Sequence, residues 1–196
     1  MIIHEQVSHH WKSKFNPRQH ALIKSKSTTT NLVANIDFIT PLVHSQLQVN
    51  AISFDFRNAF DLVPHPLLLR KLVLGPSLFI ILINDLCSAI KYSNCFLFAY
   101  DVKIYREIKS PYYSCISDIS NDRVWCISNY MNLNVNKTRV ISLCRKNSHG
   151  FDYKLRESSI TRTDCIRDMV VLIDTNLHFH IFSHAVGLLG LILTVT

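Results

Sequence analysis

The sequence predicts an α+β fold in which an antiparallel sheet is flanked by helices on one face. Three observations predict this class. Two segments, at 31–47 and 115–131, repeat their apolar residues at three and four positions, as amphipathic helices do. Two apolar runs lie on either side of a tight turn within residues 95–105, as in an antiparallel hairpin. The predicted elements follow the order helix, strand, two helices, hairpin, helix and strand.

The first predicted elements are a helix and a strand. The helix covers residues 31–47, with the polar run 28–31 as its cap and a bend at Pro41. The strand covers 49–56 and ends with Asp55 close to a turn. The remaining predicted elements are, in order, a Leu-rich helix after Pro66, a buried helix from Ser77 to about Ala89, a hairpin over 95–105 with its turn near Tyr100 and Asp101, an amphipathic helix over 115–131, and strands over 133–145, 153–155 and 169–173.

Composition limits the broad class of the protein. The 196 residues are 48% hydrophobic, which is enough to bury one core and predicts a single domain. Lys and Arg number 21 against 14 acidic residues, and the net charge of +7 favours a polyanionic partner. The six cysteines form no CxxC pair, and the N-terminus lacks the apolar core of a signal peptide, so a reducing, intracellular location is expected. No membrane segment is expected, because the apolar run 185–196 is shorter than the roughly 20 residues that span a bilayer.

Two acidic residues stand where a phosphoryl-transfer site would need them. Asp55 ends the first predicted strand, and Asp101 lies at the turn of the predicted hairpin. Two Mg²⁺ ions about 4 Å apart require carboxylates that converge from neighbouring strands. The spacing alone is equally typical of acids that sit in solvent or cap a turn.

Six blocks of the sequence resemble, in the same order, the reverse-transcriptase domain of non-LTR, LINE-type (jockey-like) retrotransposons. The blocks are QHALIKSKSTTTNLV from residue 19, FDFRNAFDLVPHPLLLRKL from 54, LGPSLFIILINDL from 74, FAYDVKIYREI from 98, WCISNYMNLNVNKTRVISLCR from 125 and DMVVLIDTNLHFHIFSHA from 168. The resemblance implies an RNA-directed DNA polymerase with a palm-like antiparallel sheet, incomplete fingers and no complete thumb. It divides the chain into a basic N-terminal arm (1–18), partial fingers (19–48), a palm (49–150), the end of the palm with the primer-grip region (151–184) and an apolar tail (185–196).

The resemblance also implies roles for individual residues. Asp55 and Asp101 would be the catalytic metal ligands of a two-Mg²⁺ site, and Lys137 would protonate the leaving pyrophosphate. The implied partners are an RNA template, a DNA primer and deoxynucleotides, in the nucleus or cytoplasm. From the residues alone, Lys137 is also consistent with a solvated lysine at a strand edge.

Three further positions are implied to bind the nucleotide. Phe56 would contribute its backbone carbonyl, and the ring of Phe60 would exclude a sugar 2′-hydroxyl. Lys26 stands in place of a finger arginine, so it offers a point charge instead of a guanidinium fork. Without the resemblance, Phe60 is better explained as a core aromatic at a helix start.

The sequence departs from the family pattern in ways that predict a catalytically impaired copy. Tyr100 replaces the first Asp of the usual pair, and Asp101 is not expected to replace it, because adjacent strand residues point to opposite faces. A few dozen residues are missing near 73–74, including a loop that helps hold the template. Smaller departures are Ala21, Ser25 and Val170 in place of glycines and Asn58 in place of a lysine. The alternative is a non-catalytic nucleic-acid binder or an inert retroelement remnant.

Two other features carry weaker hypotheses. A Zn²⁺ site could be formed by His178, His180 and His184, with His9 and His10 from the other end of the chain, although no Cys lies close in sequence. The tail 185–196 could bind a membrane or a partner, or be a reading-frame remnant without a role.

Overall fold

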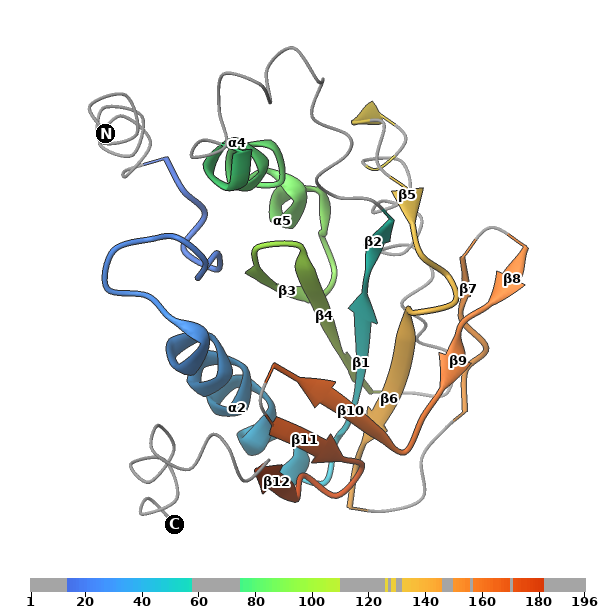
Figure 1. The fold of residues 1–196 in the computed structure, drawn as a ribbon. Helices are drawn as coiled ribbons and strands as arrows, with labels where there is room; N and C mark the ends of the chain where they lie inside the picture. Colours follow the sequence, from blue (N-terminus) through green and yellow to red (C-terminus); the bar gives the residue numbers. More distant parts are fainter. Residues whose placement is uncertain are drawn as a thin grey trace.

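The protein is built around one five-stranded sheet. The computed structural model describes residues 14–57, 75–109, 126, 128–129, 132–145, 150–155, 157–169 and 171–181. The strands of the central sheet lie in the order β3 (Asn94–Phe98), β4 (Asp101–Ile108), β1 (Gln48–Phe54), β6 (Arg139–Leu143) and β9 (Thr161–Arg162) (Figure 1). All neighbours are antiparallel except β6 and β9, which are parallel. The predicted mixed α+β class with a mostly antiparallel sheet is therefore confirmed.

Three small sheets surround the central one. The largest has the order β10 (Cys165–Asp168), β11 (Val171–Asp174) and β12 (Phe179–Ile181). The other two are the pairs β2 (Phe56–Arg57) with β5 (Asn132–Leu133), and β7 (Lys154–Leu155) with β8 (Ser158–Ser159). Strands of two to four residues are too short to show an alternating pattern, so the sequence predicted few of them.

Helix α2 (Thr28–His44) begins three residues earlier than predicted, because its N-cap is Ser27. The Ser27 Oγ atom accepts the Thr30 backbone N–H at 3.2 Å, and Thr30 Oγ1 accepts the Ser27 N–H at 2.8 Å. This reciprocal capping box satisfies two N–H groups that a helix start otherwise leaves unpaired. The helix continues through Pro41 for one more turn.

The buried helix predicted from Ser77 to Ala89 is divided in two. Helix α4 (Gly75–Leu82) and helix α5 (Leu86–Ala89) are separated by a turn at 83–85. The Asn84 side chain accepts the Asn16 backbone N–H at 2.6 Å and donates to the Lys14 carbonyl at 2.9 Å. A side chain that bonds to another segment's backbone competes with helix continuation, and the division falls at this residue.

Both faces of the central sheet are covered, so the prediction of helices on one face was wrong. Cross-strand partners such as Ile52 and Ile104 lie on one face, and Ala51 and Tyr105 lie on the other. The first face packs against α4 and α5 in a core that includes Ile52, Phe54, Phe79, Ile83, Leu86, Val102 and Ile104. The second packs against α2 and β10–β11 in a core that includes Leu32, Ile39, Val43, Val49, Ala51, Tyr105, Ile141 and Ile166.

Several predicted features lie outside the described residues. These are most of the N-terminal arm, Phe60, the Leu-rich helix after Pro66, the junction at 73–74, nearly all of the 115–131 helix, Val170 and the tail. Among the residues that are described, the five cysteines form no disulfide and no helix is long and apolar enough to cross a membrane.

A buried ion pair joins β10 to the central sheet. Lys103 of β4 contacts Asp168 of β10 through Nζ and Oδ1, and both side chains are almost completely buried. The Asp168 Oδ2 atom has no hydrogen-bond partner among the described residues. The free energy needed to remove two charges from water offsets much of their mutual attraction, so this pair contributes mainly by fixing where β10 lies. Loss of one partner would leave an uncompensated buried charge.

Replacing Lys103 by Met should therefore lower the free energy of unfolding by about 3–5 kcal/mol, because Asp168 stays buried without its partner. The matched control is Lys109→Met, since Lys109 forms a solvent-exposed pair with Glu107 at 3.6 Å and should lose less than about 1 kcal/mol. Urea denaturation measures both. The double variant Lys103→Met, Asp168→Leu should recover most of the loss, and equal effects of the two lysine variants would contradict this account.

Candidate active site

The register between β1 and β4 brings Asp55 and Asp101 together. The last paired residues of the two strands are Phe54 and Val102, and one step further along both strands places Asp55 opposite Asp101. Cross-strand partners project from the same face of an antiparallel sheet. The Asp55 carboxylate is also near enough to help raise the pKa of Asp101. Two of the sequence-predicted site residues are therefore neighbours on one face.

The turn that precedes Asp101 lies one residue earlier than predicted. Phe98 pairs with Asp101, so the two turn residues are Ala99 and Tyr100, and Asp101 is the first residue of β4. Ala99 has φ 52°, which is unusual for a residue with a side chain. Tyr100 is 39% exposed at the tip. Asp101 is therefore the first strand residue after the turn, and it faces the same side as Lys103 and Asp55.

Lys137 approaches the same carboxylate from a third segment. Its Nζ atom lies 3.7 Å from Asp55 Oδ2, and the lysine side chain is 69% exposed. The turn that carries Lys137 is fixed at Asn134, whose backbone N–H donates to the Asp55 carbonyl at 2.7 Å and whose side chain donates to Asp55 Oδ2 at 3.3 Å. Asp55, which follows β1, therefore has Asp101 of β4 opposite it and Lys137, from the turn after β5, beside it.

The charges around Asp101 nearly balance. Burial is the main cause that raises the pKa of Asp101, Lys103 opposes it, and Asp168 and Asp55 add to it. The three carboxylates and the ammonium groups of Lys103 and Lys137 leave a net charge of −1. This is little compensation for two divalent cations. Within the described part of the chain, no three acidic, His or Cys side chains are grouped to hold a metal ion. The donors present thus fall short of a two-metal site.

Phe56 follows Asp55 directly and packs its buried ring into the core beneath α4 and α5. The bond from the Asn134 N–H to the Asp55 carbonyl flanks the Phe56–Leu133 pair, so that pair is of the non-hydrogen-bonded kind. The Phe56 carbonyl therefore points away from β5.

Lys26 lies apart from the carboxylates. Its Nζ atom donates to the carbonyls of Pro17 and Gln19, the latter at 2.8 Å, and burial lowers the pKa of Lys26. The ammonium group thus closes the loop at 17–26 on itself. In this loop Ser25 has φ 69°, a left-handed conformation that glycine adopts more easily than serine.

Three residues that complete the site were not predicted. Lys103 could have been found, because strand alternation places it on the same face as Asp101. Asn134 belongs to a quoted block but gives no local sign of bonding to Asp55. Asp168 is brought to the site only by tertiary packing of β10, for which the sequence has no local signal.

The structure describes only two of the five histidines of the hypothetical Zn²⁺ site. His178 lies 2.9 Å from Asp174 through Nδ1 and Oδ2, and His180 belongs to strand β12 and not to a helix. His9, His10 and His184 lie outside the described residues.

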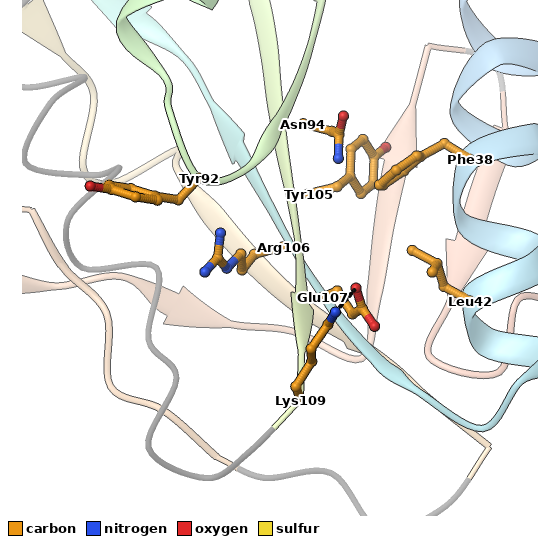
Figure 2. Close-up of a pocket in the computed structure, with 8 residues that line it drawn as sticks. All are labelled: Phe38, Leu42, Tyr92, Asn94, Tyr105, Arg106, Glu107 and Lys109. Carbon is orange, nitrogen blue, oxygen red and sulfur yellow. Dashed lines mark ion pairs between the residues drawn. The ribbon is translucent and has the colours of Figure 1, made fainter.

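A pocket of about 340 Å³ lies at the opposite end of β4 from Asp101 (Figure 2). Phe38 and Tyr105 line one side of it, and Arg106 stacks its guanidinium over the Tyr92 ring at 5.9 Å. The pocket contains none of the carboxylates described above, so it is separate from the candidate site.

The chain matches none of the protein-family models with which it was compared, and no curated protein matches it.

His20 provides a test of the loop that ends in Lys26. Its ring contacts Thr30 Oγ1 at 2.9 Å, and burial together with the Lys26 charge lowers the pKa of His20 to about 4. An unfolded histidine titrates near 6.5, so the unfolded chain takes up a proton first as pH falls. Stability is fully present above about pH 6.5 and is lost toward pH 4, by ~2 kcal/mol between pH 7.5 and 5.

Urea denaturation at several pH values measures this loss, and His20→Gln is the control because glutamine does not titrate. The difference in stability between the two proteins should shrink steadily from pH 7.5 to 5. A pH-independent difference would mean that His20 is not held neutral by the fold.

Proposed function

We propose that this chain is the palm and partial fingers of a LINE-type reverse transcriptase whose ability to copy RNA into DNA is impaired. The observation that carries the proposal is that Asp101 and Lys137 both lie beside Asp55. The resemblance named these three residues from separate blocks of sequence, and 82 positions separate Asp55 from Lys137. In an unrelated basic α+β domain, nothing would be expected to bring these particular side chains close together.

The inherited reaction is attack of a primer 3′-hydroxyl on a deoxynucleotide paired with an RNA template, with release of pyrophosphate. Lys137 is an exposed cation beside Asp55, where it can contact the leaving phosphates and hand over a proton. The Phe56 carbonyl and the Asp55 carboxylate lie side by side in the chain and offer oxygen ligands from one strand end.

Impairment follows from the number and balance of the charges. Mg²⁺ prefers several oxygen ligands, and Asp55 and Asp101 are two carboxylates whose charges are largely offset by Lys103 and Lys137. Tyr100 presents a neutral phenol at the tip of the turn, which is a poor ligand for a hard cation. The two-metal arrangement implied by the family therefore lacks donors among the residues that the structure describes.

The second candidate is a nucleic-acid binder without catalysis. It is favoured by the exposure of Lys137 at the site and by the net charge of +7. Phosphate contacts need cations at the surface but no metal ligands, so this activity survives the changes that remove polymerisation.

Primer extension on an RNA template with Mg²⁺ tests the first candidate. We expect no incorporation by the unmodified chain and slow incorporation by Tyr100→Asp, because a carboxylate beside Asp101 adds a metal ligand. Adding Asp55→Ala to the revertant should abolish the product. Asp152→Ala is the control for loss of an exposed carboxylate elsewhere.

Each result of that assay has a distinct meaning. Incorporation by the unmodified chain that requires Asp55 would contradict the proposed impairment. A revertant that folds but remains inactive would place the defect in the missing segment near 73–74 and favour the second candidate.

Binding to a fluorescent RNA–DNA template-primer tests the second candidate. Affinity should fall steeply with salt, and Lys137→Gln should reduce the slope of log affinity against log salt by about 1, because one phosphate contact is lost. Asp55→Ala should bind at least as well as the unmodified chain, since it frees Lys137 from its carboxylate. An affinity that is independent of salt would argue against nucleic-acid binding.

A further inference from the structure

The side chain of Gln19 links the 14–26 segment to the turn that carries the site. Gln19 is completely buried. Its Oε1 atom accepts three backbone N–H groups, from His20 and Ala21 at 3.0 Å each and from Ala99 at 3.2 Å. Ala99 is the first residue of the β3–β4 turn, so one amide oxygen connects two segments that are 80 residues apart.

The chemistry of these bonds requires an oxygen. Three N–H donors converge on the Oε1 atom of Gln19. An amide nitrogen could not take its place, because that nitrogen is itself a donor. The Nε2 atom of Gln19 is buried with no hydrogen-bond partner in the described part of the chain. Since an unsatisfied buried donor costs roughly 1–3 kcal/mol, the acceptor is the useful half of this side chain.

The same segment also borders β3. Gln19 forms a parallel bridge with Leu97, whose N–H donates to the Arg18 carbonyl and whose carbonyl accepts the His20 N–H, both at 3.0 Å. The edge of β3 is therefore bound just before the turn, and Gln19 binds the turn itself. The turn needs this support, because Ala99 has a positive φ that is strained for a residue with a Cβ atom.

We propose that Gln19 is a positioning residue, which holds the Ala99–Tyr100 turn in place and thereby keeps Asp101 opposite Asp55. Its importance for catalysis or binding rests on the proposed function, but its mechanical role does not. Lys26 also holds this segment, because its Nζ atom donates to the Gln19 backbone carbonyl.

The test compares Gln19→Met, which keeps the length but loses the acceptor, with Gln19→Glu, which keeps an acceptor and loses the unpaired NH₂ group. The matched control is Gln48→Met, since Gln48 is also buried and hydrogen-bonded, to Asn50 at 2.8 Å, at the far end of β1. Hydrogen exchange of the Ala99 amide, measured by NMR, reports on the turn without template, primer or metal.

In the unmodified chain, the Ala99 amide should be protected although it lies in a turn. Gln19→Met should speed its exchange at least tenfold beyond any change in global stability. Gln19→Glu should preserve the protection, because three N–H groups stabilise a carboxylate acceptor. Gln48→Met should leave the exchange of Ala99 unchanged.

Two outcomes would overturn the proposal. One is fast exchange of Ala99 in the unmodified chain, which can be seen even if Gln19→Met fails to fold. The other is an Ala99 exchange rate in Gln19→Met that equals that of the unmodified chain. Absence of primer extension affects neither measurement, so failure of the proposed function remains distinguishable.

Discussion

The register between β1 and β4 is the constraint on which the rest of the structure depends. Strand β4 has partners on both edges and buried residues on both faces. A slip of one residue would turn Val102 and Ile104 away from the core under α4 and α5 and force Lys103 into it. Burial of these apolar residues fixes the register, and the register places Asp101 opposite Asp55. The geometry of the site is thus a consequence of packing and needs no bound nucleotide.

The same face of the sheet changes from apolar to charged along its length. Val49 and Ala51 pack under α2, whereas Lys103, Asp101 and Asp55 follow toward the other end. The Lys103–Asp168 pair lies at this boundary. Strand β10 therefore covers the apolar end of the face, and Asp101 and Asp55 lie beyond the pair. One ion pair therefore both orients the small sheet and supplies the cation that most opposes a raised pKa of Asp101.

The sequence predicted those features whose cause is local. The β3–β4 hairpin was predicted because alternation and turn chemistry are read from neighbouring positions. Its turn lies one residue earlier and its second strand ends three residues later than predicted, so Asp101 already belongs to β4. Ser27 was missed as a cap because Thr30 takes the place of the usual Glu or Gln in its capping box. The bonds of Gln19 and Asp168 join distant segments and leave no local trace.

Fold and chemistry depend on different parts of this chain. The central strands come from 48–54, 94–98, 101–108, 139–143 and 161–162, so the junction near 73–74 lies in none of them. Tyr100 is likewise a turn residue with an exposed ring, and its identity affects the cores little. Under the proposed function, changes at these positions would remove metal ligands and template contacts while the packing that brings Asp101 and Lys137 beside Asp55 is kept. The carboxylates and the exposed Lys137 would then remain without polymerisation, so nucleic-acid binding has to be tested separately from synthesis.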